Sequence, residues 1–149
     1  MKRSLVFFSA ALISGGALAL DAFTCPFPLG MQASLGVPNE AIKARDSGVP
    51  KEALLARIPQ QNASNKWLVF LMKQITDEVF DFSPLDTATY GAYRGELCFM
   101  AQKYPERKIS GNYVVAHPKL LACASKSVDE DKIKCAMGVV HSIENVKEE

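Results

Sequence analysis

Three side chains that are close in the sequence could form a binding site. Arg94 follows Tyr90 by four residues and Tyr93 by one, so in a helix the Arg94 guanidinium can lie along the Tyr90 ring. One interpretation places Arg94 at the mouth of a groove, where it would recognise a carboxylate. The other pairs it structurally with an acidic residue of a neighbouring helix. We favour the second, because one arginine without convergent polar groups is a weak sign of a binding site.

No other pattern points to catalysis, a metal or a cofactor. Glu78, Glu96 or a tyrosine could act as an acid or base, but nothing in the sequence fixes a pair. The two histidines, His117 and His141, have no cysteine, histidine or carboxylate at the spacing that metal ligands require. We expect His117 near a helix start and His141 on a helix flank, either on the surface or paired in the core. The sequence therefore predicts no catalytic residues, no metal and no cofactor.

The four cysteines are better explained as disulfides than as metal ligands. An even number of cysteines in an exported chain suggests two bridges, for which three connectivities exist. The spacing favours Cys25–Cys98, which would tie the chain start to a central helix, and Cys123–Cys135, which would join two adjacent helices.

The first 19 residues have the pattern of a secretory signal peptide. Lys2 and Arg3 precede a short apolar run, and Ala17-Leu18-Ala19 provides an A-x-A cleavage site. The apolar run is too short for a comfortable membrane span, which needs roughly 20 residues. We therefore expect export to the periplasm or the exterior, with a single helical domain over residues 20–149 and no stable membrane span in the mature chain.

The charge balance argues against a nucleic-acid partner. The chain has 17 basic and 16 acidic residues, and loss of Lys2 and Arg3 with the signal peptide leaves a formal charge of about −1. A mixed, solvated surface is the simplest interpretation of these charges.

Apolar spacing predicts the helices that must position these residues. The main one runs from about Pro84 to Tyr104, with Ser83 as its cap and with small residues nearly opposite its apolar face. Another helix is expected from about Ala63 to Phe82. Further helix starts are expected at Pro38, Pro50 and Pro118, and at the capping box that begins at Ser127. Gly48 is expected to end the helix that starts at Pro38, in a left-handed conformation.

Two connecting segments are expected between these helices. Residues 25–30 should form an extended lead-in, held by Cys25 and by the packing of Phe27 and Leu29. Val114 and Val115 could form a short strand or the start of the next helix. The predicted fold is therefore all-α, a small disulfide-linked bundle of about five to six helices around the 84–104 helix.

Residues 25–104 resemble small exported bacterial proteins of unassigned activity. The resemblance is carried by Cys25, by the A-x-x-A-R-D-x-G-V-P pattern of residues 41–50, by the helix ending at Phe80, and by the helix with Tyr93 and Cys98. It implies no catalytic residues. Residues 113–147, with Cys123 and Cys135, depart from this pattern and are expected to form an added helical hairpin.

These observations leave three functions open. The first is a non-enzymatic protein that binds one protein partner in the periplasm, such as an immunity or accessory protein, and we favour it because no catalytic motif is present. The second is a carrier of a small ligand or lipid, suggested by the Trp- and Phe-rich helix and the two-sided central helix. The third is a cell-envelope enzyme that acts through Glu96, Glu78 or a tyrosine.

Overall fold

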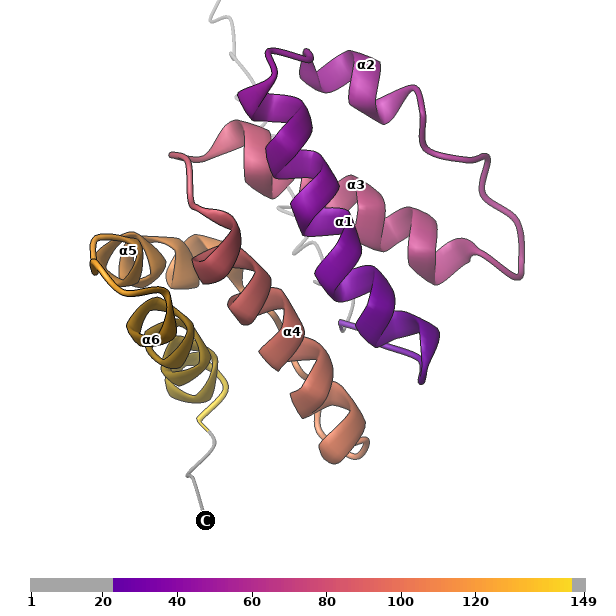
Figure 1. The fold of residues 1–149 in the computed structure, drawn as a ribbon. Coiled ribbons are helices and arrows are strands. Elements are labelled where there is room, and N and C mark those ends of the chain that lie inside the picture. The colour runs from indigo at the N-terminus through magenta and orange to yellow at the C-terminus, as the bar shows by residue number, and fades with distance from the viewer. Residues whose placement is uncertain (1–22, 146–149) are drawn as a thin grey trace, which may run out of the picture.

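The computed structural model describes residues 23–145, which form six α-helices and no strand (Figure 1). The predicted signal peptide lies outside the described residues. The all-α fold predicted from the sequence is confirmed. In chain order the helices are α1 (Leu29–Asp46), α2 (Lys51–Leu55), α3 (Lys66–Asp81), α4 (Thr87–Lys103), α5 (Tyr113–Ala124) and α6 (Asp129–Ile143).

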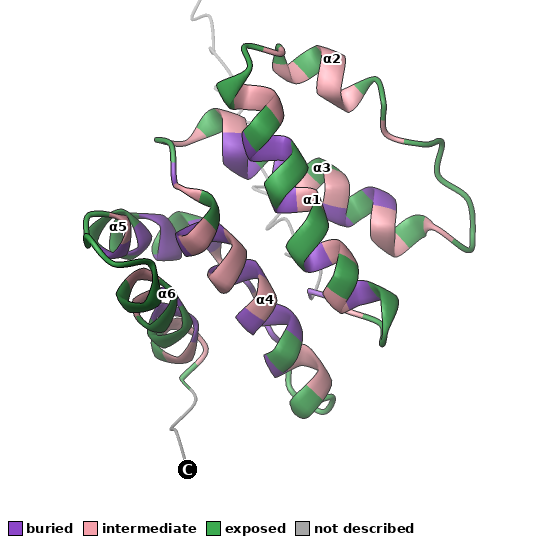
Figure 2. Ribbon diagram, viewed as in Figure 1, coloured by how far each residue is buried: buried purple, intermediate pink, exposed green. Residues whose placement is uncertain are grey.

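Helix α4 lies in the middle of the bundle (Figure 1). It packs against α1 on one side and α6 on the other, while α3 packs against α1 and α5 against α6. Its apolar face is buried as the spacing predicts, with Tyr90, Tyr93, Leu97 and Met100 each at most 1% exposed. Figure 2 shows buried residues along α4, whereas the short α2 has none. The core is therefore organised around α4.

The opposite side of α4 lets α1 come close because its residues are small. A Cβ atom on Gly95 would lie only 3.0 Å from Cδ2 of Leu35 in α1. Further along the same side, Cys98 is bonded to Cys25, and Nε2 of Gln102 donates to the Cys25 carbonyl oxygen at 3.3 Å. Gly91 has nothing within 4 Å of a Cβ position, so only the second half of the small-residue side is in close contact.

Two disulfides link the chain, with the pairing that the cysteine spacing favours. Cys25–Cys98 spans 73 residues with a Cα–Cα distance of 5.3 Å and holds the start of α1 against α4. Cys123–Cys135 spans 12 residues with a Cα–Cα distance of 5.5 Å and joins α5 to α6. Disulfides persist in oxidising surroundings, so the structure points to an environment outside the cytoplasm.

Two prolines lie inside helices that they were expected to start. Helix α1 begins at Leu29, and Pro38 is buried within it, where packing in the core offsets the missing backbone hydrogen bond. Helix α5 begins at Tyr113, so Val114 and Val115 belong to a helix rather than a strand. Pro118 lies on the exposed side of α5, where water can satisfy the carbonyl group that loses its donor.

The helix caps also differ from those expected. Helix α4 begins at Thr87, and its cap is Asp86 rather than Ser83, with Oδ1 of Asp86 accepting a hydrogen bond from the Thr89 backbone N–H at 3.0 Å. The Ser127 capping box is wrong, because α6 starts after Val128 without a side-chain cap. The expected left-handed stop is confirmed, since Gly48 has a φ of 75° directly after α1.

The lead-in before α1 does not pack as predicted. Phe27 and Leu29 are 82% and 59% exposed, although the expectation was that their packing would hold this segment. The segment is held instead by the Cys25–Cys98 bridge and by Phe23, which is 7% exposed and donates its backbone N–H to the Ile109 carbonyl oxygen at 3.0 Å. Gly30 closes the turn by donating to the Pro26 carbonyl oxygen at 2.6 Å.

Candidate functional site

Arg94 does not lie at the mouth of a groove; it is fully buried between α3 and α4. Its Nη1 lies 3.2 Å and 3.1 Å from the two carboxylate oxygens of Glu78, and its Nη2 lies 3.4 Å from Oε1 of Gln74. Its guanidinium also stacks over the Phe23 ring, 5.1 Å from the ring centre. Arg94 is thus paired with an acid of a neighbouring helix, the interpretation that the sequence favoured.

Tyr90 and Tyr93 extend this buried cluster. The Tyr90 hydroxyl donates to Oε2 of Glu78 at 2.6 Å, and the Tyr93 hydroxyl donates to the Gly111 carbonyl oxygen at 3.2 Å. Burial raises the pKa of the Glu78 carboxyl group, and the attraction of Arg94 and the Tyr90 hydrogen bond offset that rise only in part. All three side chains named by the sequence are therefore used inside the core and are not open to a ligand.

Other acids and histidines, buried or half-buried, also join elements of the fold. Oε1 of Glu96 in α4 lies 2.7 Å from Nε2 of His141 in α6, so His141 is paired in the core. Nε2 of His117 lies 3.0 Å from the carbonyl oxygen of Ser83 and fixes the connection between α3 and α4. The Glu144 carboxylate accepts hydrogen bonds from the backbone N–H groups of residues 110 and 111 at 3.1 Å and 3.0 Å.

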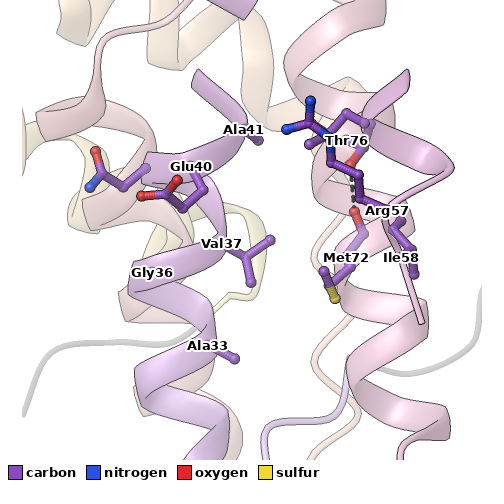
Figure 3. A pocket seen from close by; sticks show the side chains of 11 residues that line it. Ala33, Gly36, Val37, Glu40, Ala41, Arg57, Ile58, Met72 and Thr76 are labelled. Carbon is purple, nitrogen blue, oxygen red and sulfur yellow. Dashed lines mark hydrogen bonds between the residues drawn. The ribbon is translucent and has the colours of Figure 1, made fainter. Parts of the chain in front are cut away.

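A groove of about 370 Å³ lies between α1 on one side and α2 and α3 on the other (Figure 3). Ala33, Val37 and Ala41 of α1 point toward Met72 of α3 and Ile58, which follows α2, as Figure 3 shows. The groove forms because the side chains of α1 are small there and because α2 is held at its start. Nζ of Lys51 lies 2.8 Å from Asp77 and 2.6 Å from Asp81 of α3.

The polar groups of this groove are few and lie in defined places. The Thr76 hydroxyl donates to the Met72 carbonyl oxygen of its own helix at 2.8 Å, so it adds no free donor to the wall (Figure 3). Glu40 belongs to the α1 side, and Arg57 reaches toward the groove from the opposite side (Figure 3). The groove therefore combines an apolar wall with one cation and one anion at its borders.

A second hollow, of about 430 Å³, lies between α3 and residues 110–114. Glu78 and Tyr113 line it, but both are more than nine-tenths buried, and Glu78 is already bound by Arg94 and Tyr90. The remaining wall mixes Phe70, Phe82 and Val114 with polar and charged side chains, namely Lys73, Gln74, Asp77, Ser110 and Asn112.

Four exposed apolar side chains lie on the first half of α1, the turn before it and the second half of α4, the elements that the Cys25–Cys98 disulfide joins. We call this surface the disulfide end and define it by Phe27, Leu29, Leu35 and Phe99, which are 82%, 59%, 50% and 47% exposed. Sequence reasoning missed this surface because it assigned Phe27 and Leu29 to the core. The signal that could have revealed it is the position of Phe27 between two prolines directly after a bridged cysteine.

No family model matches the chain, and comparisons with curated proteins and with solved structures also find no match. Within residues 23–145, no group of three or more histidine, cysteine, aspartate or glutamate side chains could hold a metal ion. None of the helices in this part of the chain is both long enough and apolar enough to cross a membrane.

Proposed function

We propose that this chain is an exported, non-enzymatic protein that binds one protein partner in the periplasm or outside the cell, and that the disulfide end is its contact surface. The observation that carries the proposal is the 82% exposure of Phe27 on a turn that a disulfide holds in place. The signal-peptide pattern and the paired cysteines support export.

The turn presents Phe27 as a rigid anchor. Cys25 is bonded to α4, the Gly30 N–H closes the turn onto Pro26, and Phe27 itself lies between two prolines. Because the backbone of the turn is already held in place, less conformational entropy is lost when a partner covers Phe27. Buried aromatic anchors of this kind supply a large share of the binding energy in protein interfaces.

The charges beside the disulfide end specify the chemistry of the partner. Residues 24–39 contain no charged side chain, whereas Lys103, Arg107 and Lys108 are exposed at the end of α4 with Glu106 as the one acid among them. The Lys103 ammonium group lies 5.8 Å from the centre of the Phe99 ring, which places basic charge next to the apolar surface. A partner with an apolar pocket and an acidic rim fits this arrangement.

The proposal is tested by measuring whether substitutions at the disulfide end weaken the complex with the protein partner. The mature protein, with its disulfides intact, is used to isolate a partner from the periplasm of its host, and the purified pair is measured by titration calorimetry. Phe27→Asp and Phe99→Asp are each expected to weaken binding at least about thirtyfold, the effect of losing an interface anchor. Val128→Asp is the matched control, because Val128 is 52% exposed but lies at the turn between α5 and α6.

Either of two results contradicts the proposal. Unchanged affinity of both aspartate variants would show that the contact lies elsewhere. Failure to obtain any one-to-one complex from the host periplasm would remove the proposed function itself.

A further inference from the structure

We propose that the groove between α1 and α2–α3 binds a single-chain fatty-acid carboxylate, with its hydrocarbon tail against the groove wall and its carboxylate on Arg57. This would be a binding activity in addition to the partner contact at the disulfide end. It rests on three features of the groove: its apolar wall, its volume, and the exposed Arg57 side chain, which has no ion-pair or hydrogen-bond partner within the described residues.

The wall suits an unbranched hydrocarbon tail. Val37, Leu54, Ile58 and Met72 are half-buried and face the groove, so each keeps apolar area that a ligand could cover. The Thr76 hydroxyl donates its hydrogen bond to the Met72 carbonyl oxygen within α3, so it does not need a partner in the groove. A volume of about 370 Å³ is within the range of small-molecule sites. An apolar tail can therefore enter without leaving a buried polar group unpaired.

Arg57 differs from the other arginines of residues 23–145. Arg45 is paired with Asp46, Arg94 with Glu78, and Arg107 lies over the Tyr104 ring. The Arg57 side chain is exposed and makes no ion pair, hydrogen bond or ring contact within the described residues. Its planar guanidinium can hold a carboxylate through two parallel hydrogen bonds.

The surrounding charges set the sign of the ligand. Lys43 and Arg57 border an adjoining hollow together with Glu40, which leaves a net positive charge at this end of the groove. Glu40 opposes a carboxylate and lies on the α1 side, across the groove from Arg57 (Figure 3). Charge complementarity thus favours an anionic head group over a cationic one.

The first experiment titrates the mature protein, freed of bound lipid on a hydrophobic resin, with octanoate, decanoate and dodecanoate below their micelle concentrations. We expect saturable one-to-one binding, with affinity rising by up to about fourfold for each added methylene group. Decyltrimethylammonium should bind more weakly than decanoate, and Glu40→Gln should tighten decanoate binding. Arg57→Gln should weaken it by about tenfold, whereas Lys126→Gln, which removes an exposed cation elsewhere, should leave it unchanged.

The second experiment fills the groove without unfolding the protein. Gly36 lines the groove and has nothing within 4 Å of a Cβ position, so Gly36→Leu can occupy the space while α1 stays intact. Gly138→Leu is the matched control, because Gly138 is an exposed glycine of α6 with equally open surroundings. Decanoate binding should be lost in Gly36→Leu and kept in Gly138→Leu, with both thermal midpoints at or above that of the wild type.

The inference is overturned if the wild type shows no saturable decanoate binding, or if Arg57→Gln and Gly36→Leu bind as the wild type does. It is also overturned if Gly36→Leu weakens the protein complex while no carboxylate binds, because the groove would then belong to the protein interface. Phe27 and Phe99 do not line the groove, so their aspartate variants should keep decanoate binding. Failure of the partner proposal and failure of this one are therefore distinguishable.

Discussion

Removing the positive charge from the buried Glu78–Arg94 pair should destabilise the protein strongly. Arg94→Met keeps much of the side-chain volume but takes both Nη1 contacts, at 3.1 Å and 3.2 Å, away from the Glu78 carboxylate. Tyr90, at 2.6 Å, then remains as a donor to a carboxylate that is 6% exposed. Loss of one partner of a buried ion pair costs about 3–5 kcal/mol, a large part of the roughly 5–15 kcal/mol that stabilises a typical domain.

The cost in Arg94→Met should depend on pH with a defined sign. Burial already raises the pKa of Glu78 from its ordinary value of 4.5, and loss of Arg94 raises it further. The folded variant therefore holds a proton that the unfolded chain releases, so its stability falls as pH rises from about 4.5 through the folded pKa. The deficit relative to the wild type should therefore be smaller near pH 4, where the carboxyl group is largely protonated in both states, than near pH 7.

The assay is urea unfolding with the disulfides intact, followed by the fluorescence of Trp67, the only tryptophan. Glu78→Leu and the double variant complete a double-mutant cycle. We expect each single variant to lose about 3–5 kcal/mol. The double variant, with an apolar pair in place of the ions, should lie within about 2 kcal/mol of the wild type or above it.

Two results would refute this reasoning. An Arg94→Met variant that loses less than about 1 kcal/mol would show that Glu78 does not depend on Arg94. Losses that simply add in the double variant would show that the two residues act independently.

Three further predictions concern stability. Tyr90→Phe removes the 2.6 Å hydrogen bond to Glu78 and should cost about 1.5–3 kcal/mol in urea unfolding. Replacing Cys123 and Cys135 by serine opens a bridge that spans 12 residues and should lower the free energy of unfolding by roughly 3 kcal/mol. The reduced wild type, which lacks both bridges, is measured beside it. Asp86→Ala removes the α4 cap and should cost about 1 kcal/mol. Burial alone would raise the Asp86 pKa, but hydrogen bonds from Thr89 lower it below its ordinary 3.8, so this contribution should be lost as pH falls below that value.

Matched controls separate these effects from general perturbation. Tyr104→Phe, in a half-buried tyrosine whose hydroxyl has no hydrogen bond within residues 23–145, should be close to neutral. Asp131→Ala, in an exposed aspartate of the first turn of α6, should lower the free energy of unfolding by less than Asp86→Ala does. A Tyr90→Phe variant as stable as Tyr104→Phe would contradict the role assigned to the buried hydroxyl.

The local signals of the sequence predict helices better than they predict helix ends. The apolar spacing of residues 63–82 and 84–104 corresponds to α3 and α4, and Gly48 ends α1 as expected. Pro38 and Pro118 misled the prediction, because burial on one helix and solvent on the other let both helices continue through a proline. The Ser127 capping pattern failed because a cap requires a backbone geometry that composition alone does not fix.

The sequence by itself determined the all-α class and the central position of α4, and its cysteine spacing favoured, without deciding, the disulfide pairing that the structure shows. These follow from periodicity and cysteine spacing, which are written along the chain. Only the tertiary structure decided that Arg94 is buried on Glu78, that Phe27 is exposed, and that Arg57 borders an apolar groove. Each of these depends on which helix lies opposite, a relation between distant residues that no local pattern records.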